Sequence, residues 1–71
     1  MPRRPRLTGK QLIGILANHG FATVRVRGSH QVLKHPDGRQ TVVPVHSGEI
    51  IGPGLLRKIM NQTELQDGDL D

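Results

Sequence analysis

An apolar stripe with helical spacing marks the first part of the chain. Leu12 and Leu16 lie one helical turn apart, and polar residues separate them from the next apolar segment. Thr8 and Gln11 have the spacing of a capping box, in which each side chain accepts a hydrogen bond from the backbone of the other. Gly20 suits the left-handed conformation that often follows a helix. The pattern predicts an amphipathic helix between Thr8 and Gly20.

Three extended segments follow, at residues 21–27, 30–34 and 39–46. In the first, apolar and polar positions alternate, which is typical of a half-buried strand. The side expected to face the core holds Ala22, Val24 and Val26. A two-residue turn, Gly28-Ser29, separates the first two segments and favours a type II′ hairpin because glycine comes first. We expect an antiparallel sheet.

A second helical stripe begins after Pro53, which fits the first position of a helix. Its apolar side is formed by Leu55, Leu56, Ile59 and Met60, with Arg57 and Lys58 opposite. The order of elements is therefore α-β-β-β-α, an α+β fold. We expect a three-stranded antiparallel sheet with two helices packed on one face, an arrangement similar to the double-stranded-RNA-binding fold.

Charge is unevenly distributed along the chain. Its formal net charge is +4 over 71 residues, but residues 1–63 carry ten basic and two acidic side chains, a net charge of +8. A compact basic body attracts polyanions through phosphate contacts. We expect a flexible basic arm at residues 1–6, one domain at 7–65 and an acidic disordered tail at 66–71. With no apolar run of the ~20 residues that span a bilayer, and no secretory signal, we expect a cytoplasmic protein without a membrane partner.

The predicted hairpin brings one histidine among several cations. In a two-residue hairpin the flanking residues pair directly, so Arg27 and His30 should lie side by side. Strand alternation adds Arg25 and Lys34 to the same open face. An imidazole often acts as a general base, and neighbouring cations can stabilise charge on a phosphate. The alternative interpretation is a histidine that only solvates a strand end.

Signatures of other chemistry are missing from the sequence. It has no cysteine, no glycine-rich phosphate loop and no nucleophile elbow. The histidines match no zinc spacing, and Asp37 is the only carboxylate near the hairpin. Phe21 is the only aromatic residue, so the chain lacks the stacking platforms of single-strand binders. We therefore expect the protein to contact the phosphates and 2′-hydroxyls of the RNA backbone. We expect no metal and no small-molecule cofactor.

Short motifs spread over residues 7–65 together resemble one known family. The run Arg27-Gly28-Ser29-His30 is followed by Pro-Asp-Gly at 36–38 and Val-Pro-Val-His at 43–46. In this order they resemble the Gly-Ser-His signature, the second turn and the third strand of the HicA toxins. The opening and closing helices also resemble those of this family.

The resemblance implies an mRNA endoribonuclease that inhibits translation, whose activity depends on His30 and which a HicB-like antitoxin neutralises by covering this surface. We accordingly expect the toxin component of a type II toxin–antitoxin system, a metal-independent nuclease with His30 as its catalytic residue. The residues expected to bind RNA are Lys10, Arg25, Arg27, Gly28, Ser29 and Lys34. Two alternatives remain open, a non-catalytic RNA-binding module of the same fold and a basic interaction protein that docks an acidic partner.

Overall fold

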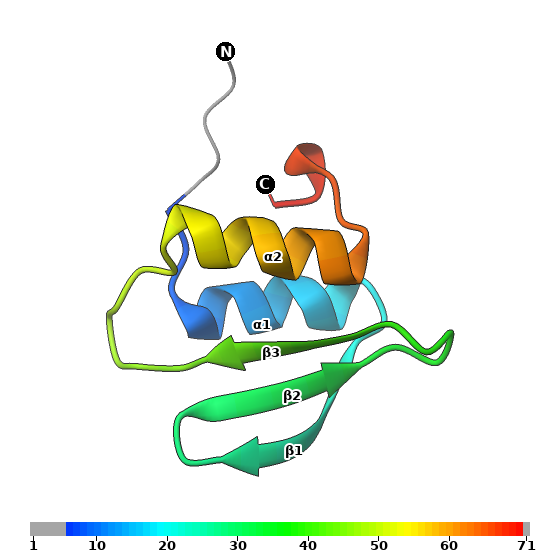
Figure 1. Cartoon of the computed structure of the whole chain (residues 1–71), viewed down its shortest axis with the longest axis horizontal. Coiled ribbons are helices and arrows are strands. Elements are labelled where there is room, and N and C mark those ends of the chain that lie inside the picture. The colour runs from blue at the N-terminus through cyan, green and yellow to red at the C-terminus, as the bar shows by residue number, and fades with distance from the viewer. Residues whose placement is uncertain (1–5, 71) are drawn as a thin grey trace.

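The computed structural model describes residues 6–70 of the chain. The α+β class and the α-β-β-β-α order are confirmed, and a short 3₁₀-helix, η1, follows the second α-helix. The elements are α1 (Gly9–Asn18), β1 (Ala22–Arg27), β2 (His30–Lys34), β3 (Gln40–Pro44), α2 (Pro53–Thr63) and η1 (Asp67–Leu70). Within these residues the strands form one antiparallel sheet in the order β1-β2-β3, as Figure 1 shows.

Local signals set the ends of α1 as predicted. The Gln11 backbone N–H donates to Thr8 Oγ1 at 3.2 Å, and the Thr8 N–H donates to Gln11 Oε1 at 2.9 Å. This capping box satisfies N–H groups that the first turn of a helix leaves without partners. After the helix, Gly20 takes a φ of 91°, in the left-handed region that glycine adopts without strain.

The prediction that β1 is half-buried is wrong. Every residue of β1 is exposed, and Val24 and Val26 keep 60% and 59% of their surface. One cause is a bulge between Thr23 and Arg25, which moves Ala22 to the face that carries Arg25. The other cause is position, because β1 is an edge strand that neither helix covers to the extent that they cover β3, the other edge strand.

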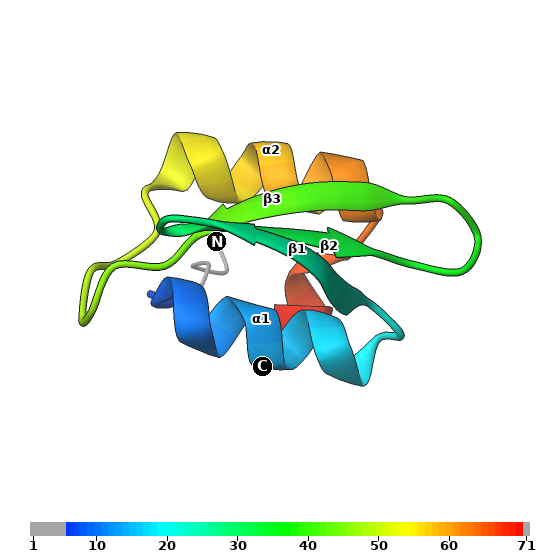
Figure 2. The ribbon, with the colours of Figure 1, turned by 90° about the horizontal axis from the view of Figure 1, so that it is seen from below.

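One core lies between α1, the sheet and α2. Leu33 of β2 and Val43 of β3 are fully buried against leucines of α1 and the apolar side of α2. The apolar sides of both helices thus join a single core, except that Leu55, expected on the apolar side of α2, remains 36% exposed. Figure 2 shows α1 on one side of the sheet and α2 beside β3. Neither helix within residues 6–70 is long and apolar enough to cross a membrane.

The C-terminal segment is part of this core, so the expected disorder of residues 66–71 is wrong for residues 66–70. Asp67–Leu70 form η1, and Leu70 is only 2% exposed. The backbone N–H of Gln66 donates to Asp69 Oδ2 at 2.8 Å, which holds the turn. An apolar side chain set among acidic residues anchors the segment, because its burial is favourable whatever its neighbours are. Asp71 and residues 1–5 of the expected arm lie outside the described residues; Arg6 is exposed.

Candidate functional site

The strand register places four of the predicted site residues on one face of the sheet. Arg27 pairs directly with His30, and directly paired residues of antiparallel strands share a face. Alternation along β2 and β1 then adds Lys34 and Arg25. All four side chains are exposed. We call this surface, defined by Arg25, Arg27, His30 and Lys34, the basic sheet face.

Lys10 is not brought together with these residues. It lies in the first turn of α1 and is exposed. The helix packs on the face that carries Leu33 and Val43, opposite the basic sheet face. Lys10 therefore has no place in the cluster around His30.

The turn before His30 is held firmly to the neighbouring strand. Gly28 takes a φ of 55°, which agrees with the predicted hairpin turn. The Ser29 carbonyl oxygen accepts a hydrogen bond from the Val45 N–H at 2.6 Å, just beyond β3. On the same strand, Pro44 lies directly opposite His30. The position of His30 is thus fixed from β1 and from β3.

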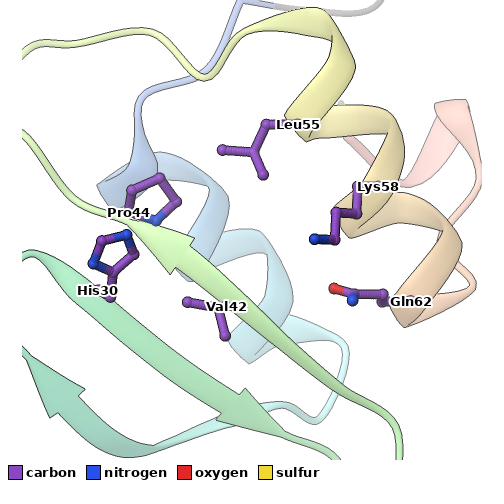
Figure 3. Close-up of a pocket in the computed structure, with 6 residues that line it drawn as sticks. All are labelled: His30, Val42, Pro44, Leu55, Lys58 and Gln62. Carbon is purple, nitrogen blue, oxygen red and sulfur yellow. The ribbon is translucent and has the colours of Figure 1, made fainter.

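His30 lines a cleft of about 250 Å³ between the sheet and α2 (Figure 3). Around the cleft lie His30, Val42, Pro44, Leu55, Lys58 and Gln62. The side chains of Lys58 and Gln62 extend from α2 towards β3 (Figure 3). Sequence reasoning missed both, although Leu55, Lys58 and Gln62 have the i, i+3, i+7 spacing of one helical face. That spacing identifies a shared face but not the strand that it meets.

Two contacts attach α2 to β3 at this cleft. Thr41, which is only 2% exposed, donates from Oγ1 to Gln62 Oε1 at 2.8 Å. The guanidinium of Arg39 donates to the Thr63 carbonyl oxygen at the end of the helix. These bonds join the C-terminal part of α2 to the start of β3.

Asp37 has a structural role away from the cleft. Its pKa is lowered, chiefly because the Arg39 backbone N–H donates to Oδ1 at 3.0 Å, and also because the Arg39 Nε lies 2.8 Å from Oδ2.

The Arg39 guanidinium and the His35 ring both pack on Phe21, each 5.1 Å from its ring centroid. Across residues 6–70, no group of three histidine, aspartate or glutamate side chains is arranged to hold a metal ion.

A comparison with protein families supports the resemblance noted in the sequence. The family model described as the HicA toxin of bacterial toxin–antitoxin systems matches residues 9–65, from the start of α1 to just beyond α2. A search of curated proteins finds no match to the chain. The family match includes every strand of the sheet, the Gly28-Ser29 turn and both walls of the cleft. The chain therefore belongs to the HicA toxin family of bacterial toxin–antitoxin systems.

Proposed function

We propose that this toxin is an endoribonuclease that cleaves mRNA and inhibits translation, with His30 as the catalytic base. The observation that carries the proposal is the position of His30, which lines a cleft and shares an exposed sheet face with Arg25, Arg27 and Lys34. A general base needs access to the substrate, and RNA needs cations along its path. Both requirements are met at one surface.

The proposed reaction is an internal transesterification. His30 accepts the proton of a ribose 2′-hydroxyl, the 2′-oxygen forms a bond to the adjacent phosphorus, and the bond from phosphorus to the 5′-oxygen breaks. The leaving 5′-oxygen takes a proton from water. The cations of the basic sheet face hold the backbone and neutralise the charge that builds on the phosphate. This scheme uses no metal and no cofactor.

The backbone at the turn contributes to RNA contact in this proposal. Gly28 is open to solvent, and a Cβ built at this position meets no atom within 4 Å. A phosphate can therefore approach the chain at Gly28 and Ser29, beside His30. Lys10, on the far side of the sheet, would bind only an RNA long enough to pass around the edge of the domain.

Membership of a toxin–antitoxin family implies an antitoxin partner. We propose that this partner is a HicB-like protein that covers the basic sheet face and excludes RNA. Because mRNA is the proposed target, we place the toxin in the cytoplasm. An acidic surface on the antitoxin would match the net charge of residues 1–63 and would speed association.

The test compares purified wild type with His30→Ala and His19→Ala on an mRNA substrate, with and without a chelator. Both histidines are exposed, so neither change should alter the free energy of unfolding by more than about 0.5 kcal/mol. His19 caps α1, away from the basic sheet face, and is the matched control. We expect cleavage by wild type and His19→Ala, unaffected by the chelator, and none by His30→Ala.

Three results would count against the proposal. Cleavage retained by folded His30→Ala would remove the histidine from the mechanism. RNA binding without cleavage by the wild type would favour a non-catalytic RNA-binding module. Negligible RNA affinity together with a tight protein complex would favour a basic interaction protein.

A further inference from the structure

The α2 wall of the cleft carries hydrogen-bond donors that face His30 across an apolar floor. Lys58 supplies an ammonium group with three donors and no acceptor. Gln62 has its amide oxygen occupied, because Oε1 accepts from Thr41 Oγ1 at 2.8 Å. Its Nε2 group carries two further donors, and Gln62 lines the cleft (Figure 3). This wall thus offers a positive charge and a fixed donor.

The chemistry of the lining selects the ligand. Val42, Pro44 and Leu55 form apolar surface between His30 and the donors, and no carboxylate is among the described residues that line the cleft. A ligand must therefore bring acceptor oxygens and negative charge to the α2 side. A volume of about 250 Å³ is below the ~300 Å³ at which pockets for drug-sized ligands begin, and suits part of one nucleotide.

We propose that Lys58 is a second catalytic residue, which binds the non-bridging oxygens of the phosphate that is cleaved. This inference rests on the proposed ribonuclease function and deepens it. The cations of the basic sheet face reach the phosphate from β1 and β2, whereas Lys58 reaches it from α2. Lys58 transfers no proton; it stabilises negative charge as the 2′-oxygen attacks and the 5′-oxygen leaves. Gln62 positions the same phosphate with its amide group.

The neighbouring residue Arg57 is the matched control that the chain itself supplies. It is also an exposed cation of α2, but it does not line the cleft. Arg57 and Lys58 make equal contributions to net charge. If these cations only attract RNA to the protein, removing either charge should change the cleavage rate equally. If Lys58 contacts the phosphate that is cleaved, only its removal should lower the cleavage rate.

The experiment measures kcat and KM for RNA cleavage with wild type, Lys58→Met, Arg57→Met and Lys58→Arg, using His30→Ala as the inactive reference. We expect Lys58→Met to lower kcat by about 10²-fold, the scale for losing one group that stabilises transition-state charge. Arg57→Met should change kcat less than threefold. Lys58→Arg should recover much of the rate because it restores a cationic donor.

The outcomes distinguish a failure of this inference from a failure of the function on which it rests. Equal kcat values for Lys58→Met and Arg57→Met, with an active wild type and an inactive His30→Ala, would overturn the role of Lys58 and leave the ribonuclease proposal standing. A raised KM with unchanged kcat in Lys58→Met would also overturn it, since that pattern indicates uniform binding. An inactive wild type would overturn both.

Gln62→Glu gives a second and independent test. The glutamate can still accept the hydrogen bond from Thr41, so the attachment of α2 to β3 is kept. It replaces the amide donor with a negative charge that faces the phosphate. We expect cleavage to fall by more than tenfold with an unchanged unfolding midpoint. Cleavage at the wild-type rate would contradict a phosphate at the α2 wall.

Discussion

Replacing Gly9 with alanine tests how the start of α1 supports the site. Gly9 is buried, and a Cβ on it would overlap the carbonyl oxygen of Pro44 and lie 3.1 Å from the Cα of Val45. These are backbone atoms, which cannot turn aside as a flexible side chain can. Either the helix or the end of β3 must move. Overpacking of this kind costs about 1–3 kcal/mol.

Gly14→Ala is the matched control on the same helix. Gly14 is exposed in the middle of α1, and a Cβ there would meet no atom within 4 Å. Alanine is favoured over glycine in a helix interior by about 1 kcal/mol. The two variants should therefore differ in unfolding free energy by about 2–4 kcal/mol, from the sum of these effects. The same substitution should therefore lower the free energy of unfolding at Gly9 and raise it at Gly14.

Thermal and urea unfolding followed by circular dichroism measure the difference. For a domain of this size, 1 kcal/mol shifts Tm by about 4–8 °C. We expect Gly14→Ala to raise Tm by that amount and Gly9→Ala to lower it by at least as much. Because Pro44 lies opposite His30, Gly9→Ala should also slow RNA cleavage below its Tm. A Gly9→Ala protein more stable than wild type would refute the close packing of α1 on β3.

Two further predictions concern parts of the fold remote from His30. Leu70→Ala should lower the free energy of unfolding, measured by urea titration, by about 2–5 kcal/mol because it removes buried apolar volume. Gln66→Ala, at an exposed position, should change it little. Equal urea midpoints for the two variants would contradict the burial of Leu70 in η1. The lowered pKa of Asp37 makes it stabilising above its ordinary value of 3.8, and this stabilisation is lost as pH falls through the folded pKa. The difference between the urea midpoints of wild type and Asp37→Asn should therefore shrink as pH falls below 3.8, and a difference that stays constant through that range would contradict the role of this carboxylate.

The sequence predicts α1 and the hairpin closely because their signals are local. The capping residues Thr8 and Gln11 act within one turn of the helix. Gly28 determines the turn through its own φ. The pairing of Arg27 with His30 then follows from the length of the turn alone. In each case the residues that carry the signal also make the interaction, so no knowledge of the tertiary structure is needed.

The burial of β1 and of the C-terminal segment could not be predicted in this way. Alternation predicted a buried side for Val24 and Val26, but alternation reveals neither the bulge in β1 nor that α1 packs against β3. Leu70 stands among acidic residues, and nothing local indicates a cavity that it fills. Both errors come from assigning a side chain to core or solvent before the neighbouring elements are placed.

The cleft is the most informative case, because its two walls come from distant parts of the chain. His30 was predicted from its hairpin, while Lys58 and Gln62 enter the site only once α2 lies beside β3. The adjacent side of the same helix supplies Leu56, Ile59 and Met60 to the core. Packing of α2 therefore completes the fold and assembles the α2 wall in one step. A ligand that binds both walls, whether RNA or an antitoxin segment, must then also stabilise the fold by mass action. Such a ligand should raise the Tm of the wild type more than that of Lys58→Met, even where both proteins are equally stable without it.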